Sequence, residues 1–203
     1  DQFYEIFNQV GLAFIFAPRY KPSPRNFAGI RQSLGARTMI NILDPLTKPA
    51  LTKRHLIGVY DQKLSKLIAQ VLKELGIFSA MVVSGENGLD EVNICGITHI
   101  VEINGEDFQE YEITPEEVGL KRRPIESIRG GDASLNKKIT LDILRGEKGG
   151  PRDVSILNAA AGLKVSGLVS DLTAGVEKAS EAIDSGRALA KLNEMIEISK
   201  KLN

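Results

Sequence analysis

Apolar and polar residues alternate along the chain with two periods, which predict strands and helices that follow one another. Spacing by two, or short unbroken apolar runs, predicts strands at Leu12–Ala17, His55–Tyr60, Ala80–Ser84, Thr98–Ile103 and Phe108–Ile113. Helical spacing predicts helices at Asp1–Val10, Phe27–Leu34, Gln62–Leu75, Ala133–Leu144, Val154–Lys164, Leu172–Ile183 and Arg187–Leu202. The segment Arg37–Leu43 fits either element. Strand–helix alternation favours an α/β fold with a largely parallel central sheet and flanking helices.

Several element ends carry their own signals. Asp61 is suited to cap the helix that follows it, and Gly76 to end that helix. Asp132 is likewise placed as an N-cap, while Asn104-Gly105 is typical of a tight hairpin turn. In the last helix, apolar residues including Leu192 and Ile196 form a stripe that we expect to be core.

Composition narrows the class of protein. The length of 203 residues favours one domain, 1–203. The 26 basic and 26 acidic residues give no net charge, which argues against a general attraction to nucleic acid or anionic membranes. The single cysteine, Cys95, excludes an internal disulfide framework and a Cys-rich zinc site. No apolar run reaches the roughly 18–20 residues of a membrane span, so we expect no membrane partner and a cytoplasmic location. A start at Asp1 inside a helix indicates a processed product or a fragment.

The run Gly85-Glu86-Asn87-Gly88-Leu89-Asp90-Glu91 is the most informative one for chemistry. It follows a strand of buried type, and ligands in such sheets bind beyond the carboxyl ends of strands. The adjacent carboxylates of Asp90 and Glu91 suit a hard cation such as Mg²⁺, which prefers oxygen ligands. The alternative is a solvated turn with two exposed acids.

Other reactive side chains have weaker signals. Arg31 and Arg37 flank a glycine and suit a carboxylate or phosphate, although their positions alone favour a helix surface. His55 and His99 lie on or beside strands without a nearby ligand-type partner in the sequence, and we interpret them as structural. Cys95 is interpreted as a small packed residue.

Taken together, several runs resemble one family in collinear order. These runs are Phe14-Ile15-Phe16-Ala17-Pro18, Arg31-Gln32-Ser33-Leu34-Gly35-Ala36-Arg37-Thr38, Asn41-Ile42-Leu43-Asp44-Pro45-Leu46-Thr47-Lys48-Pro49-Ala50, Gly58-Val59-Tyr60, Gly88-Leu89-Asp90-Glu91, Thr114-Pro115, Gly130-Gly131-Asp132, Leu157-Asn158-Ala159-Ala160 and Gly175-Val176-Glu177-Lys178-Ala179. They resemble the central and carboxy-terminal part of the anthranilate phosphoribosyltransferases. The amino-terminal helical domain and the glycine-rich diphosphate loop of that family are absent from this sequence.

The resemblance implies a large domain like that of nucleoside phosphorylases and phosphoribosyltransferases. It also implies transfer of the 5-phosphoribosyl group from phosphoribosyl pyrophosphate to anthranilate in tryptophan biosynthesis. By resemblance, Asp90 and Glu91 hold Mg²⁺ against the diphosphate, Arg31 contacts anthranilate and Pro45 walls its tunnel. No covalent nucleophile is expected. The missing amino-terminal part would be a partner, the complete enzyme a homodimer, and the isolated chain inactive.

Two departures from the family fall in the acceptor region. Lys21 stands where the family usually has His, and Asp44 where it usually has Gly. We expect the two side chains to approach each other across the tunnel mouth, the alternative being unrelated surface residues. Two other functions stay open on this evidence. One is a non-catalytic relative that binds nucleic acid or a protein, and the other a phosphoribosyltransferase or phosphorylase with a different acceptor.

Overall fold

The computed structural model describes residues 2–15, 46 and 52–202. Contacts between Cα atoms divide the chain into two compact units, Thr52–Arg187 and a second made of Asp1–Leu51 with Ala188–Asn203. The single domain expected from chain length therefore stays a prediction. Among the described residues, no helix has the length and apolar character of a membrane span.

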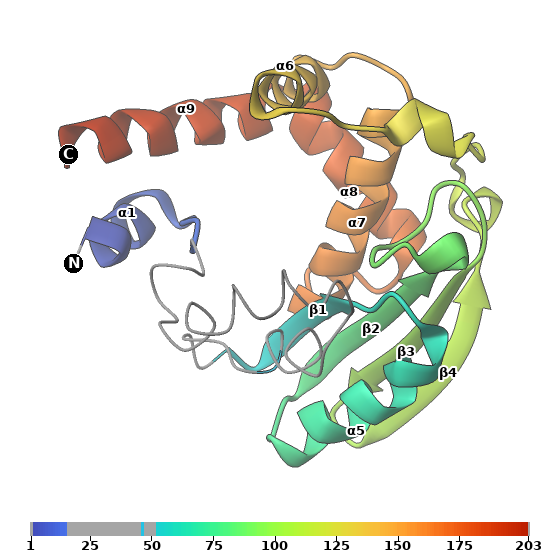
Figure 1. Cartoon of the computed structure of the whole chain (residues 1–203). Coiled ribbons are helices and arrows are strands. Elements are labelled where there is room, and N and C mark those ends of the chain that lie inside the picture. Colours follow the sequence, from blue (N-terminus) through green and yellow to red (C-terminus); the bar gives the residue numbers. More distant parts are fainter. Residues whose placement is uncertain (1, 16–45, 47–51, 203) are drawn as a thin grey trace, which may run out of the picture. The chain divides into compact units, whose positions relative to one another are not determined.

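The larger unit is built on a four-stranded sheet in the order β1-β2-β3-β4 (Figure 1). Its strands are β1 (Arg54–Gly58), β2 (Ser79–Gly85), β3 (Thr98–Asn104) and β4 (Asp107–Ile113). The β1–β2 pair is parallel, whereas β2–β3 and β3–β4 are antiparallel. The α/β class with flanking helices is confirmed. The largely parallel pairing is not found among the described strands, because tight connections such as the Asn104-Gly105 turn reverse the chain.

The four α-helices of the larger unit lie at predicted helical segments, whereas of its four short 3-10 helices only η1 lies within one. They are η1 (Gln62–Leu64), α5 (Ser65–Glu74), η2 (Glu86–Gly88), η3 (Glu116–Val118), η4 (Ile125–Ile128), α6 (Ala133–Leu144), α7 (Gly150–Ser166) and α8 (Leu172–Asp184). The two predicted caps are confirmed. The Asp61 carboxylate accepts from the Lys63 amide at 3.0 Å, and that of Asp132 from the Leu135 amide at 2.8 Å.

The two faces of the sheet are covered by different helices. Lys164 of α7 pairs with Glu102 of β3, whereas Lys66 of α5 lies 3.8 Å from Glu110 of β4. Because Glu110 is opposite Val101 in the register, and alternate residues point to opposite faces, Glu102 and Glu110 face opposite ways. Thus α7 covers one face and α5 the other (Figure 1).

The second unit is described only by α1 (Gln2–Val10), residues 11–15 and 46, and α9 (Arg187–Lys201) from Ala188 onward. The Lys191 ammonium donates to the Val10 carbonyl at 3.1 Å and thereby joins the two helices. Residues 12–15, the described part of the first predicted strand, are irregular. The predicted core stripe of α9 was wrong for this structure, since α9 has no buried residue and Ile196 is 38% exposed. Only α1 is available among the described helices of this unit to cover it.

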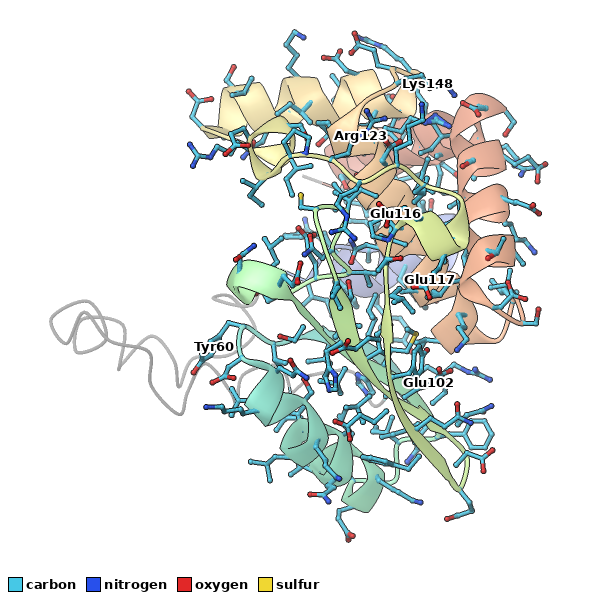
Figure 2. All side chains as sticks on the ribbon, turned by 90° about the vertical axis from the view of Figure 1, so that its right-hand side faces the viewer. Tyr60, Glu102, Glu116, Glu117, Arg123 and Lys148 are labelled. Atoms are coloured by element: carbon cyan, nitrogen blue, oxygen red, sulfur yellow. The ribbon has the colours of Figure 1, made fainter. Side chains whose placement is uncertain are left out.

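A polar cluster lies between α7 and the sheet. The Tyr111 hydroxyl donates a hydrogen bond to the Glu102 carboxylate at 2.6 Å. The Lys164 ammonium donates to the same carboxylate (Glu102 is labelled in Figure 2). Burial and the hydrogen bond to Glu102 raise the pKa of Tyr111 above its ordinary value of about 10. The folded state therefore favours the protonated phenol.

We predict that Tyr111→Phe destabilises the chain by about 1 kcal/mol near pH 8, because one hydrogen bond to Glu102 is lost. A group whose pKa is higher in the folded state contributes its full stabilisation at pH values below its unfolded-state pKa. This stabilisation is lost as the pH rises. The difference between wild type and variant should therefore shrink as pH rises above about 10, where the unfolded phenol ionises. Urea denaturation of wild type and variant, from near pH 8 to above about 10, measures this difference in the free energy of unfolding. A difference that stays constant or widens contradicts the prediction.

Candidate active site

The two predicted metal ligands lie in the connection between β2 and β3. All seven residues of β2 are buried, and η2 then turns the chain outward. Asp90 follows on the surface and is exposed, whereas Glu91 is partly buried and leads into a fully buried stretch that begins at Val92. The pair thus stands where the chain re-enters the core, with Asp90 at the surface and Glu91 partly enclosed.

The first half of this connection is closed by hydrogen bonds at its base. The Gly85 amide donates to the Leu89 carbonyl at 2.8 Å, which forms a tight turn before Asp90. Glu86 and Ile97 bond twice, from the Glu86 amide to the Ile97 carbonyl and from the Ile97 amide to the Glu86 carboxylate, each at 3.0 Å. Glu86 is therefore occupied in holding the loop together.

The second half is fixed by side chains from inside the unit. The Asn93 amide donates to the Thr98 hydroxyl at 2.8 Å, and the Cys95 amide donates to the Asn93 side chain at 2.7 Å. The Val92 amide donates to the Asn158 side chain of α7 at 2.9 Å. The segment around Asp90 and Glu91 is thus ordered by contacts on both sides.

The carboxyl end of β1 lies directly under this segment. A Cβ atom on Gly58 would stand 1.6 Å from the backbone carbonyl oxygen of Asp90, a distance that no side chain can accommodate. The absence of a side chain at Gly58 is what lets the acidic segment rest on the strand end. This position agrees with the rule that ligands bind beyond the carboxyl ends of strands.

The electrostatics of the pair favour a cation. Burial, and secondarily the charge of Asp90, raise the pKa of Glu91 above its usual range. A cation beside Glu91 would offset the repulsion from Asp90 and favour the ionised carboxylate. Among the described residues there is no group of three or more His, Cys, Asp or Glu placed to hold a metal. Two carboxylates suit an ion such as Mg²⁺, which commonly takes its remaining ligands from water and phosphate oxygens.

A cavity of about 300 Å³ opens beside the same loop. Its walls include Tyr60 (labelled in Figure 2), Asp61, Glu86, His99 and Glu112, and none of its described lining residues is Lys or Arg. A phosphorylated ligand in this cavity would therefore need a bound cation or backbone amides to balance its charge.

The remaining candidates divide into structural residues and residues outside the described part of the chain. A ring nitrogen of His55 lies 3.0 Å from the Thr52 carbonyl oxygen, and Nε2 of His99 lies 3.3 Å from the Glu110 carboxylate. Both histidines are buried, which agrees with a structural role. Burial, with the nearby carboxylates of Glu91 and Glu126, raises the pKa of the Cys95 thiol, which disfavours the nucleophilic thiolate. The predicted substrate residues, Arg31, Pro45 and Lys21, with Arg37 and Asp44, lie outside the described residues.

Sequence reasoning missed two residues that shape the site. Gly58 had a signal, since a glycine within a strand often marks the close approach of another backbone. Asn158 had a weaker one, because Asn is disfavoured in helix interiors and its presence there calls for a partner. Neither pattern predicts which segment of the chain contacts Gly58 or Asn158.

Comparisons with known proteins identify the family of this chain. A model of the glycosyl transferase family, a/b domain, matches residues 1–189. An anthranilate phosphoribosyltransferase from Thermoanaerobacter sp. (strain X514) is 43% identical over 198 residues, which make up 98% of this chain and 59% of that protein.

Solved structures extend the similarity to the fold. The crystal structure of anthranilate phosphoribosyltransferase from Thermus thermophilus superimposes with a TM-score of 0.90 at 36% identity and covers 98% of this chain. The Saccharomyces cerevisiae enzyme in complex with PRPP and Mg gives a TM-score of 0.76 at 27% identity over 86% of this chain. The chain spans 59% and 51% of the lengths of these two proteins, respectively.

The resemblance predicted from the sequence runs is thereby confirmed. Since the family model covers nearly the whole chain and the fold is retained, this chain belongs to the glycosyl transferase family with an a/b domain.

Proposed function

We propose that the protein to which this chain contributes transfers the 5-phosphoribosyl group from phosphoribosyl pyrophosphate to anthranilate, releasing diphosphate. The observation that carries the proposal is the position of Asp90 and Glu91, side by side at a strand end in a chain that superimposes along its length on a known anthranilate phosphoribosyltransferase. The yeast relative described as a complex with PRPP and Mg supports both the donor and the ion.

In this proposal the chain supplies the acidic side of the donor site. Asp90 and Glu91 hold Mg²⁺, which when bound neutralises charge on the departing diphosphate. No side chain needs to attack the sugar covalently, and the unreactive setting of Cys95 agrees with that. The acidic pair acts by orienting its ion, and its backbone anchors keep that orientation fixed.

The acceptor side rests on residues outside the described part of the chain. Arg31 orients the anthranilate carboxylate through its guanidinium, and Pro45 walls the acceptor tunnel. Lys21 approaches Asp44 at the tunnel mouth and offsets a negative charge that would otherwise repel the acceptor carboxylate.

The rest of the site comes from sequence that this chain lacks. Because the chain spans 59% of the length of its Thermoanaerobacter relative, we assign the remainder of the donor site to an amino-terminal part. We further propose that the complete enzyme is a cytoplasmic homodimer active in tryptophan biosynthesis.

Asp90→Asn combined with Glu91→Gln in the complete enzyme should lower turnover by about two orders of magnitude or more, because the ion loses both carboxylates. Steady-state assays across a range of Mg²⁺ concentrations measure this, and circular dichroism confirms the fold. Unchanged Mg²⁺-dependent turnover would remove these residues from the site.

The isolated 203-residue chain should catalyse no measurable phosphoribosyl transfer, because one side of the diphosphate site is missing. Activity should return when the amino-terminal part is supplied. Turnover by the isolated chain would require a different donor site.

The Lys21–Asp44 pair is tested by a double-mutant cycle on the KM for anthranilate. Lys21→His and Asp44→Gly should each change KM, and their combined effect should differ from the sum of the two single effects. Additive effects would show that the two side chains act independently.

A further inference from the structure

Asn158 bonds the backbone of the residue that follows the acidic pair. Its side-chain oxygen accepts from the Val92 amide at 2.9 Å, and its side-chain nitrogen donates to the Val92 carbonyl at 2.9 Å. The same nitrogen donates to the Val154 carbonyl one helical turn earlier at 3.0 Å. The amide thus satisfies both backbone groups of Val92, as a neighbouring strand would do, and is itself oriented by its own helix.

Both sides of the acidic pair are thereby constrained. Gly58 lies beneath the Asp90 carbonyl oxygen, where a Cβ atom would stand at 1.6 Å, and Asn158 fixes Val92 immediately after Glu91. The Val92 side chain is fully buried, which anchors its position but does not by itself set the rotation of the backbone. The two hydrogen bonds from Asn158 fix that rotation, and with it the backbone from which the Glu91 side chain projects.

The helix that carries Asn158 is a firm support. Near its start, the buried Arg152 guanidinium binds the Asp184 carboxylate of α8 through two bonds of 2.9 and 3.0 Å. Asp153 binds Arg123, which Figure 2 labels, and near the other end Lys164 binds Glu102. Because α7 is tied at both ends, displacement of Asn158 would require displacement of the helix.

We propose that Asn158 is a positioning residue that holds Asp90 and Glu91 in their cation-binding arrangement, with Gly58 as the surface on which the segment rests. The inference rests on the proposed function of the two carboxylates. Asn158 does not touch the ion or the substrate in this proposal, and it acts only through the backbone of Val92.

The chain contains a matched control. Asn136 of α6 makes the same double contact with Gly131, accepting from its amide and donating to its carbonyl at 2.9 Å each. Truncation of Asn136 therefore removes the same type of bond pair away from the acidic segment, although this pair is more exposed and joins residues close in sequence. A general effect of losing such an amide on folding appears in both variants, whereas an effect on the cation site appears only with Asn158.

The experiment titrates Mn²⁺, as a paramagnetic probe, into the 203-residue chain and follows free Mn²⁺ by electron paramagnetic resonance. Asn158→Ala should weaken binding about tenfold, as expected for loss of a residue that orients a metal ligand. Asn136→Ala should bind as wild type does, and thermal unfolding of both variants reports their folding. If Asn158→Ala does not fold, Asn158→Ser, which is also too short to bridge Val92, takes its place.

Amide hydrogen exchange gives a second readout. The Val92 amide should exchange faster in Asn158→Ala, while the Asn93 amide, bonded to Thr98, should stay protected. Wild-type Mn²⁺ affinity despite an exposed Val92 amide would overturn the proposal, and so would an unchanged Val92 amide. If Asp90→Asn with Glu91→Gln binds Mn²⁺ as well as wild type, the fault lies instead in the proposed metal function.

Discussion

The complete burial of β2 is the constraint on which the larger unit depends. All seven of its residues are buried, so both faces of the strand must be covered and both edges must be paired. Strands β1 and β3 satisfy the edges, and α7 and α5 cover the faces. A strand enclosed on every side can contact a ligand only at its end. In β2 that end is Gly85, with the connection that follows it.

The order of elements could be predicted because it depends on local patterns. The helix over Ala133–Leu144 matched residue for residue. Asp61 caps the short helix η1 that leads into α5, and Gly76 follows the last turn of α5 with a φ of 72°. The direction of the strands was harder to predict. An apolar run such as Thr98–Ile103 is compatible with either pairing, and only the turn at Asn104-Gly105 indicated a hairpin.

The acidic pair could be found in the sequence, whereas its supports could not. Asp90 and Glu91 stand out as adjacent carboxylates after a strand. Gly58 and Asn158 are 32 residues before Asp90 and 66 residues after Val92, and they become part of the site only through β1 and α7. Their roles depend on long-range contacts. The local sequence pattern around an asparagine does not predict which distant backbone its side chain will contact.

The structure of the acidic segment also explains why a rigid backbone and poorly stabilised carboxylates occur together. Glu91 is partly buried beside a like charge, and both features raise its pKa and make its ionised form costly. A flexible loop would relieve this cost by turning the side chain toward water. The bonds to Asn158, the contact with Gly58 and the closed turn at Gly85 oppose that movement. The segment therefore holds Asp90 and Glu91 together at the end of β1, an arrangement that a bound cation would stabilise.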